Sequence, residues 1–477
     1  MSASSRGPLR RFGAVLVAAL ALAGAVSLAA PASAASGPNI DPDTVGSLTI
    51  HKYQSPNEDP GLPNNGTEVD DSDLTPLGGV EFTLTAVTDI DLTTNDGWDE
   101  AAELADAVAA GGGLDGHTTA AVGARTTAAD GSAVFDDLAL GVYYVQETDP
   151  GDHPIVASVA PFIVTIPLPT TVDGQSRWLY DVHVYPKNAL SGTEKTIDDS
   201  EATGLGDTVS FGIDSDIPSF YGTEELSSYS IVDELDPRLA FTASSAVVTA
   251  EDSDGEAITL TEGADFTVTE PSTATGGTLT IEFTDDGIEA LAAAPGGTVH
   301  VAFETTVKSI GDGTITNDSV TYINDVDIVS NSVETLWGAI RIVKYDAETD
   351  VELAGAVFEV YGSSTGGEPI SVDGQTQFTT GDDGSVIIPG VKAGTYWIDE
   401  VVAPDRYLPF DGRIEVVVTA GSLDEAVEVR VANRKIPDME LPLTGGDGGA
   451  WLIAGGIALV AIAAGSGLLL ARHRARR

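Results

Sequence analysis

The sequence predicts an all-β protein built from β-sandwich domains in tandem. Short stretches rich in Thr and Val alternate with turn signals such as Asp254-Gly255 and Gly276-Gly277, whereas long helical patterns are few. Strand-like segments of the first third of the chain recur in the last third. The length of 477 residues accommodates about three domains of roughly 150 residues each.

Recurring segments relate the first domain to the last. The matching pairs are GSLTIHKY with GAIRIVKY (46–53 and 338–345), PLGGVEF with ELAGAVF (76–82 and 352–358), and GVYYVQE with GTYWIDE (141–147 and 394–400). We therefore expect these two domains to be copies of one β-sandwich. The middle stretch has strand patterns of its own, at 208–213 and 298–307. The best candidate for a helix is 98–110, an insertion in the first domain.

The N-terminus has the three parts of a secretory signal peptide. A basic stretch with Arg6, Arg10 and Arg11 precedes an apolar core, and Ala32-Ser33-Ala34 provides small residues for cleavage. The alternative is an uncleaved membrane anchor. The small-residue site and the polar residues after it favour cleavage, so we expect the mature chain to begin at Ala35.

The C-terminus carries a second apolar run, 451–471, followed by a basic tail that is expected to stay cytoplasmic. Its 21 residues are just long enough, at about 1.5 Å each, for a bilayer core of roughly 30 Å. A plain tail anchor is the alternative to the interpretation that the preceding residues support. Leu441-Pro442-Leu443-Thr444-Gly445 resembles the LPXTG cell-wall sorting signal of Gram-positive surface proteins. That resemblance implies a sortase that recognises Leu441, Pro442, Thr444 and Gly445, cuts after Thr444 and passes the threonine to an amine.

These features divide the chain into five parts. We expect a signal peptide at 1–34, domains at 35–188, 189–335 and 336–437, and a sorting region with a transmembrane helix at 438–477.

Composition excludes several classes of protein. The chain has 22 Lys and Arg against 74 Asp and Glu, a net charge of -52, which repels nucleic acids and anionic lipids. It has no cysteine, so disulfides do not staple this exported protein. Either its cores suffice or another crosslink is used.

Strand phase places polar residues where a core should be. Side chains two apart share a face, so Lys52 follows Leu48 and Ile50, and Lys344 follows Ile340 and Ile342. By the same count, three carboxyl groups and one amide fall on apolar faces: Glu147, Glu400, Asp233 and Asn433.

Because an unpaired buried charge is costly, these polar groups are expected to be partners. One interpretation is a set of buried Lys–Glu ion pairs, or strand ends that fray to solvent. The other is an internal Lys–Asn isopeptide bond. Burial would give a neutral amine and a protonated acid, the amine would attack the asparagine amide, and ammonia would leave. This reaction would be a single self-modification, not enzymatic turnover.

The chain resembles the SpaA-type major pilins, which have collagen-adhesin-like (Cna-B-like), immunoglobulin-like domains. Residues 178–188 (WLYDVHVYPKN) resemble the pilin motif, and 396–407, which includes Glu400, resemble the E-box. The sorting signal is the third hallmark. The resemblance implies a pilus shaft subunit in which Lys187 accepts Thr444 of another copy.

Phase within the pilin-like motif agrees with that role. Val182, Val184, Pro186 and Asn188 fall on one face, while Lys187 falls on the other. Lys187 is therefore expected to point outward and to be reachable, with Asn188 pointing inward. An ordinary solvated lysine is the alternative.

The resemblance also implies internal crosslinks. They would be Lys344–Asn433 promoted by Glu400, and Lys195–Asn317 promoted by Asp233. Asn324 and Asn331 are rivals to Asn317, because the strand pattern breaks phase between Ile315 and Val320. A third bond, Lys52–Asn188 with Glu147, has the weaker pattern. Asn188 lies farther beyond its last valine than Asn433 does, and Pro186 intervenes.

The partners implied are other copies of the chain, a pilus-specific class C sortase, accessory pilins and peptidoglycan at the cell wall. A monomeric wall-anchored adhesin or stalk is the alternative, and it needs no Lys187. An enzyme is not expected, since the chain has no cysteine and its body has no Gly-x-Ser-x-Gly elbow. No cofactor is expected, and no metal, because the six histidines lack metal-ligand spacing.

Overall fold

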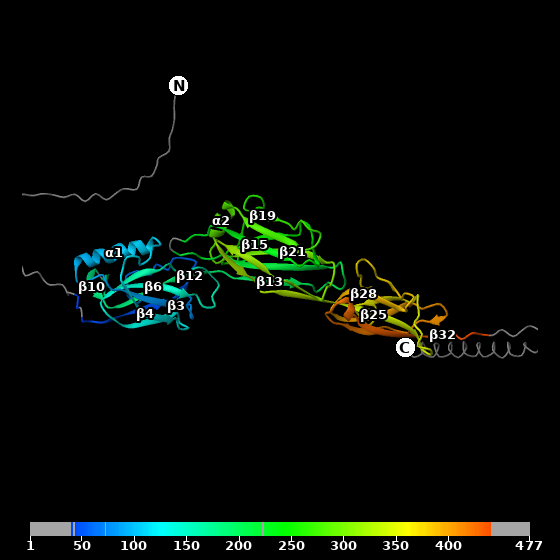
Figure 1. Ribbon diagram of the computed structural model, residues 1–477. Coiled ribbons are helices and arrows are strands. Elements are labelled where there is room, and N and C mark those ends of the chain that lie inside the picture. Colours follow the sequence, from blue (N-terminus) through cyan, green and yellow to red (C-terminus); the bar gives the residue numbers. More distant parts are fainter. Residues whose placement is uncertain (1–39, 42, 72, 173, 222–223, 440–477) are drawn as a thin grey trace, which may run out of the picture.

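The computed structural model describes residues 40–439 apart from 42, 72, 173 and 222–223. The expected signal peptide, the sorting motif and the C-terminal apolar run therefore lie outside the described residues. Within the described part, no helix is both long and apolar enough to cross a membrane. Three β-rich domains follow one another in a row, from the blue end to the orange end of Figure 1.

The first domain is a sandwich of two main sheets. One sheet has the order β11 (Asp181–Val184), β1 (Gly46–His51), β5 (Ser132–Leu138). The other has the order β4 (Thr119–Thr126), β3 (Glu81–Val87), β6 (Gly141–Asp149), β8 (Phe162–Ile166). A small sheet of β2 (Tyr53–Gln54), β12 (Lys187–Leu190) and β7 (Ile155–Ala157) extends the first, and β9 (Leu168–Val172) pairs with β10 (Gln175–Leu179).

The last domain repeats this topology. Its first sheet joins β25 (Val333–Asp346), β32 (Val427–Lys435), β28 (Ser385–Lys392), β30 (Tyr407–Leu408) and β22 (Thr314–Asn317). Its second has the order β27 (Phe378–Thr379), β26 (Val357–Tyr361), β29 (Gly394–Val402), β31 (Ile414–Val418). β25 pairs in parallel with β32 and antiparallel with β28, as β1 pairs with β11 and β5. The recurring sequence segments thus correspond to a repeated fold.

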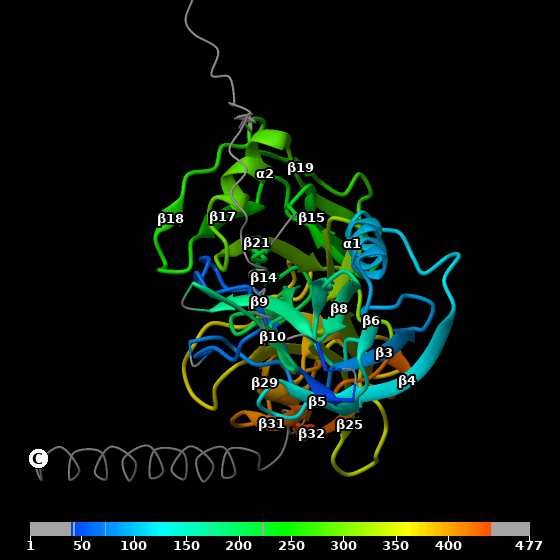
Figure 2. The ribbon, with the colours of Figure 1, turned by 90° about the vertical axis from the view of Figure 1, so that its left-hand side faces the viewer.

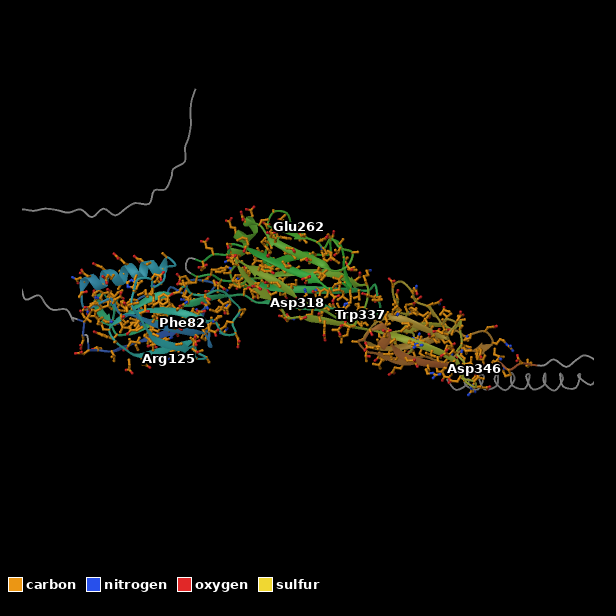
Figure 3. The ribbon with its side chains drawn as sticks, in the orientation of Figure 1. Phe82, Arg125, Glu262, Asp318, Trp337 and Asp346 are labelled. Carbon is orange, nitrogen blue, oxygen red and sulfur yellow. The ribbon has the colours of Figure 1, made fainter. Side chains whose placement is uncertain are left out.

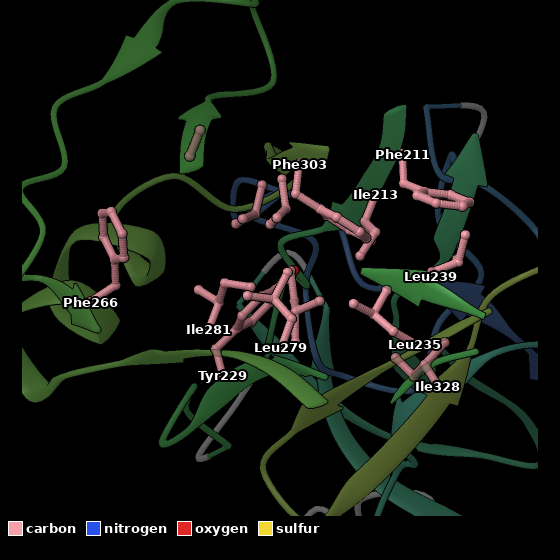
Figure 4. Packing of buried hydrophobic residues seen from close by; sticks show 14 of the residues in the cluster. Phe211, Ile213, Tyr229, Leu235, Leu239, Phe266, Leu279, Ile281, Phe303 and Ile328 are labelled. Atoms are coloured by element: carbon pink, nitrogen blue, oxygen red, sulfur yellow. The ribbon is translucent and has the colours of Figure 1, made fainter. Parts of the chain in front are cut away.

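The middle domain packs two antiparallel sheets of its own. One contains β13 (Thr193–Asp198), β14 (Thr208–Asp216), β21 (Thr298–Val307), β17 (Val247–Glu251), β18 (Ala257–Ile258) and β16 (Leu239–Phe241). The other contains β19 (Phe266–Thr269), β20 (Gly277–Phe283), β15 (Tyr229–Leu235), β23 (Ser319–Ile323) and β24 (Val326–Val329). Aromatic and branched side chains from both sheets meet between them, and the Phe211 and Phe303 rings stack 5.4 Å apart (Figure 4).

Two α-helices accompany the strands of the described residues, besides one 3-10 turn at Leu423–Glu425. The expected helix in the first domain exists as α1 (Asn95–Ala109), which packs against β8 on the flank of that domain (Figure 2). It begins earlier than predicted because the Thr94 side chain caps it by accepting a hydrogen bond from Gly97 N. The second helix, α2 (Asp285–Ala292), was not predicted from the sequence, and Thr284 caps it in the same way.

A single strand joins the middle domain to the last. β25 pairs with β22 at its start and with β28 and β32 farther along. Trp337, within it, is fully buried and donates from Nε1 to the Thr335 hydroxyl (3.0 Å; Figure 3). Lys392 forms an ion pair with Asp199 across the same junction, 2.7 Å apart. This ion pair links a side chain of the last domain to a side chain of the middle domain.

Candidate crosslinking sites

In the last domain, Lys344 lies inside the sandwich with both proposed partners. The side chain comes from β25, which neighbours flank on two sides, and none of the residue is exposed. Its Nζ lies 2.5 Å from Asn433 Oδ1 and 3.4 Å from Glu400 Oε1. Asn433 Nδ2 donates to the same carboxyl oxygen (2.7 Å), and Phe410 N donates to the other (2.6 Å).

Burial changes the chemistry of this amine. Removing Lys344 from water lowers its pKa to about 8, although Glu400 acts in the opposite direction. With such a pKa, roughly a tenth of the amines are neutral at pH 7, whereas an ordinary lysine is almost fully charged. The parallel pairing of β25 with β32 explains the contact, because Lys344 stands opposite Val431, two residues before Asn433.

The first domain holds an equivalent cluster. Lys52 Nζ contacts Asn188 Oδ1 and lies 2.8 Å from Glu147 Oε2, while Asn188 Nδ2 donates to Glu147 Oε1 (2.7 Å). Lys52 and Asn188 are fully buried, and burial lowers the pKa of Lys52 to about 8. Val159 N also donates to Asn188 Oδ1 (2.8 Å) and fixes the orientation of that amide.

Neither the intervening Pro186 nor the distance of Asn188 from its last valine keeps Lys52 and Asn188 apart. The register of β1 with β11 and of β2 with β12 places Pro186 opposite Lys52, as Val431 stands opposite Lys344. Asn188 then follows two residues later, at the same offset as Asn433. Pro186 fits because its carbonyl still accepts from Tyr53 N (3.1 Å) and the missing N–H is not needed there.

In the middle domain, Lys195 and Asp233 are fully buried and in direct contact. The Lys195 ammonium lies 5.3 Å from the centres of both the Phe211 and Phe303 rings. Burial lowers the pKa of Lys195 and raises the pKa of Asp233, so both changes favour the neutral forms. Asn317 is buried, and its amide nitrogen and oxygen have no hydrogen-bond partner within the described part of the chain. The Asn317 side chain nevertheless lies close enough to Asp233 to lower the pKa of that carboxyl group, against the larger effect of burial.

The two rival asparagines are occupied elsewhere. Asn331 exchanges two hydrogen bonds with the backbone of Lys195, accepting from its N–H and donating to its carbonyl. Asn324 lies half-buried in a turn, and its side-chain oxygen accepts hydrogen bonds from Ser227 N and Ser228 N. The geometry therefore favours Asn317.

The expected break in strand phase near Asn317 does not occur. Alternate residues from Ile315 to Ile323 are all buried, and they include Ser319 and Thr321. Val320 is half-buried on the opposite face. The sequence prediction was wrong because it assigned the core face to the valine, whereas hydroxyl groups fill it; Thr321 shares hydrogen bonds with Thr193 and Ser215.

These clusters contain the parts that an amide exchange needs. In the first and last domains the carboxyl group faces the amine and the amide nitrogen, so it can take a proton from the ammonium and pass it to the leaving nitrogen. The neutral amine then forms a bond to the asparagine carbonyl carbon, the bond from that carbon to Nδ2 breaks, and ammonia departs.

Lys187 has a different environment. It neighbours Asn188 on β12 but points to the other face, where it is half-buried. Its Nζ lies 4.5 Å from the centre of the Tyr221 ring, in the middle domain, and donates to Tyr185 O (3.2 Å). Burial lowers its pKa, and Asp59 acts in the opposite direction. The alternation of faces is as predicted, but Lys187 is less open than expected.

The cover over Lys187 comes from parts of the chain that sequence reasoning did not connect with it. Tyr221 lies between β14 and β15, and Asp59 lies in the loop after β2. Behind them, His51 and Tyr185 stack with ring centres 4.7 Å apart, and His51 Nε2 bonds His183 Nδ1 (2.9 Å). No periodicity or motif in the sequence marks Tyr221, because its contact with Lys187 depends on how two domains meet. The remaining predicted site residues, Leu441, Pro442, Thr444 and Gly445, lie outside the described residues.

Comparison with known proteins identifies all three domains. Residues 43–189 match a family model for the N-terminal domain D1 of Gram-positive pilin subunits. Residues 187–336 match a model for the C-terminus of a cell surface antigen, and 338–433 match the SpaA prealbumin-like fold domain.

Relatives of known class extend over nearly the whole chain. The chain is 31% identical to fimbrial subunit type 2 of Actinomyces naeslundii, over 96% of this chain and 97% of that one. It is also 31% identical to fimbrial subunit type 1 of Actinomyces viscosus, over 97% and 98%. The structure of the full-length major pilin SpaD from Corynebacterium diphtheriae is similar, with a TM-score of 0.68 and 30% identity over 84% of this chain and 99% of that one. The chain therefore belongs to the SpaA-type major pilins of Gram-positive bacteria.

Proposed function

We propose that the protein is the shaft subunit of a sortase-assembled surface pilus, in which an amide bond joins Thr444 of one copy to Lys187 of the next. A pilus-specific sortase would hold Thr444 as a thioester on its cysteine. The neutral Lys187 amine would attack the thioester carbonyl, the carbon–sulfur bond would break, and the cysteine thiol would leave with the proton. Accessory pilins and peptidoglycan would be further partners, and the pilus would stand at the cell surface.

The contrast between Lys187 and the three buried lysines of the chain is the main support for this proposal. Lys52 and Lys344 are each sealed inside a domain beside an acid and an asparagine, and Lys195 is sealed inside the middle domain beside Asp233. Lys187 is held only by a carbonyl oxygen and a ring face, and it remains partly open to solvent. Three lysines are thus suited to internal bonds, and one is suited to a bond with another molecule.

We further propose that each domain closes one internal isopeptide bond: Lys52–Asn188, Lys195–Asn317 and Lys344–Asn433, promoted by Glu147, Asp233 and Glu400. The bonds would take the place of the disulfides that a chain without cysteine cannot form. Each one would restrict the unfolded chain, as a disulfide across a long loop does by on the order of 4 kcal/mol.

Denaturing gels of surface extracts test the assembly. The wild-type protein should give a ladder of high-mass polymers. Lys187→Ala should abolish the ladder while export continues, and Lys187→Arg should do the same because a guanidinium remains charged. Lys308→Ala, at an exposed lysine of the middle domain, is the matched control and should polymerise normally.

Thr444→Ala should leave uncut precursor. A ladder in the Lys187 variants would overturn the proposed linkage. A single anchored species in the wild type would identify a monomeric stalk.

A further inference from the structure

The far end of the last domain, where β32 ends (Figure 1), carries several exposed large apolar side chains. The exposed large apolar side chains there come from the end of β29, from β30 and the loop after it, and from the residues after β32. They are Val401, Val402, Leu408, Phe410, Ile436 and Met439, which we call the apolar tip. Leu408 is 57% exposed and Met439 is 89% exposed. Grouped apolar side chains of this kind mark interaction sites on soluble proteins.

Backbone contacts bring the segments that carry these residues to the same end of the domain. Leu408 pairs with Arg434 between β30 and β32, and Ile436 N donates to Arg406 O (2.8 Å). Phe410 N is fixed on the buried Glu400 carboxyl group. The apolar tip is thus attached to the rigid end of the sandwich, beside the proposed crosslink.

Three cations border the apolar tip, and one of them, Arg406, is paired with Asp438. Arg434 and Lys435 directly follow the buried Asn433 and are exposed, and neither forms an ion pair within the described part of the chain. The chain as a whole has 74 acidic against 22 basic side chains. Adjacent cations without partners are therefore available for an acidic surface on another molecule.

Chain length limits where the apolar tip can lie in a polymer. Thr444 is five residues beyond Met439, and a chain spans at most about 3.6 Å per residue, or roughly 18 Å in all. A lysine side chain adds about 6 Å. If Thr444 is joined to Lys187 of a second copy, Met439 lies within roughly 25 Å of the Cα atom of that lysine. This step rests on the proposed function.

The surface beside Lys187 has the complementary charge. The loop between β2 and β3 contains Glu58, Asp59, Glu68 and Asp73, all exposed, and we call residues 57–73 the acidic loop. Asp59 interacts with the Lys187 charge, and Glu68 interacts with His51 and Tyr185 on the same face. Tyr221 is 45% exposed next to Lys187 and offers an apolar contact.

We propose that the apolar tip docks without covalent bonds onto the acidic loop of a second copy, with Arg434 and Lys435 facing Glu58 and Glu68, and that this contact presents Thr444 to Lys187. Complementary charges mainly accelerate association and fix its orientation. The apolar side chains would be removed from water in the contact. The docked pair then has the two reacting groups close together before the amide bond forms.

Charge reversal in the full-length protein, assembled by its sortase, tests the docking. One variant carries Arg434→Glu and Lys435→Glu, a second carries Glu58→Lys and Glu68→Lys, and a third carries all four. We expect each double variant to form covalent dimers about tenfold more slowly, because like charges then face one another. Cleavage after Thr444, measured as loss of precursor, should proceed at the wild-type rate. The fourfold variant should recover the dimer rate.

The control variant carries Arg177→Glu and Lys308→Glu, which change the net charge as much as the reversal of Arg434 and Lys435 does at exposed residues elsewhere. It should behave as the wild type. Unchanged dimer rates in the double variants, or no recovery in the fourfold variant, would overturn the docking proposal. Recovery also separates contact between copies from contact with the sortase, because only two surfaces that meet can compensate for one another.

A sortase-independent measurement separates this proposal from the proposed function. Chains with Lys187→Ala, released from the wall, cannot be joined through Lys187, and their self-association at low salt can be followed by sedimentation. The double reversals should weaken that association and the fourfold reversal should restore it. If none of these charge reversals alters the self-association, the docking proposal is contradicted, regardless of whether the covalent ladder forms. A ladder that persists without Lys187 contradicts the linkage alone.

Discussion

At the scale of single residues, the environment of each lysine determines which bond it can form. Lys52 and Lys344 have a pKa near 8 because burial removes their charge from water. Each also has an amide oxygen and a carboxyl group as neighbours. Lys187 shares the lowered pKa, but within the described residues no side-chain carboxyl or amide group forms a hydrogen bond or ion pair with its amine. We therefore expect the first two to react internally as soon as the domains fold.

The role of the acids can be measured by mass. Without any sortase, the purified wild-type protein should weigh one ammonia less for each internal bond. Glu400→Ala should restore one ammonia, because no carboxyl group would then move a proton to the leaving nitrogen of Asn433. Asp399→Ala, at the half-buried neighbouring position, is the control and should leave the mass deficit intact. A full mass in the wild type would reject the bonds and leave buried ion pairs.

Tyr221 should control the reactivity of Lys187. Tyr221→Ala removes the ring that covers the amine, so the pKa of Lys187 should rise toward the ordinary value of 10.5. Titration of Lys187 acylation against pH, read by peptide mass spectrometry, should show this upward shift of the midpoint. Tyr322→Ala, at another exposed tyrosine of the middle domain, should not shift it. A midpoint unaltered by Tyr221→Ala would mean that the ring does not shield the amine.

At the scale of elements, strand phase was the reliable part of the sequence prediction. An alternation of period two placed the side chains of Lys52, Glu147, Asp233 and Lys344 inside, because β-strands fix the direction of their side chains. Phase alone could not select Asn317, because Ser319 and Thr321 occupy core positions that a search for apolar residues overlooks. The helix α2 could not be predicted for a related reason: its eight residues hold too few apolar positions to show a helical period.

Contacts between elements that are distant in the chain could not be predicted from the sequence. The cover of Lys187 joins a loop of the first domain to Tyr221 of the middle domain, 34 positions along the chain. The apolar tip assembles from two segments, 401–410 and 436–439, that only the pairing of β30 with β32 brings together. Neither grouping has a local pattern, because each depends on the tertiary fold.

At the scale of the whole molecule, the proposed bonds define a path for force along the row of domains (Figure 1). Tension would enter at Lys187 and leave at Thr444. The Lys195–Asn317 and Lys344–Asn433 bonds would lie on this path and carry the load past most of the middle and last domains. The first domain would lie outside this path, attached to it at Asn188. The Lys52–Asn188 bond would therefore contribute to stability but would not bear the load.

Single-molecule pulling between positions 187 and 444 tests this path. Lys344→Ala should add an unfolding step, because the roughly 90 residues up to Asn433 could then extend by about 30 nm. Lys52→Ala should leave the extension trace unchanged and serves as the control. Equal lengthening in both variants would contradict the load path or the choice of Lys187 as its start.

The linkage between copies is the central claim, and peptide mass spectrometry of polymers isolated from the cell surface tests it most directly. The account predicts a branched peptide in which the Thr444 carbonyl is bonded to Nζ of Lys187. Polymers joined through another lysine, such as Lys308, or chains that retain an intact Thr444–Gly445 bond would contradict it.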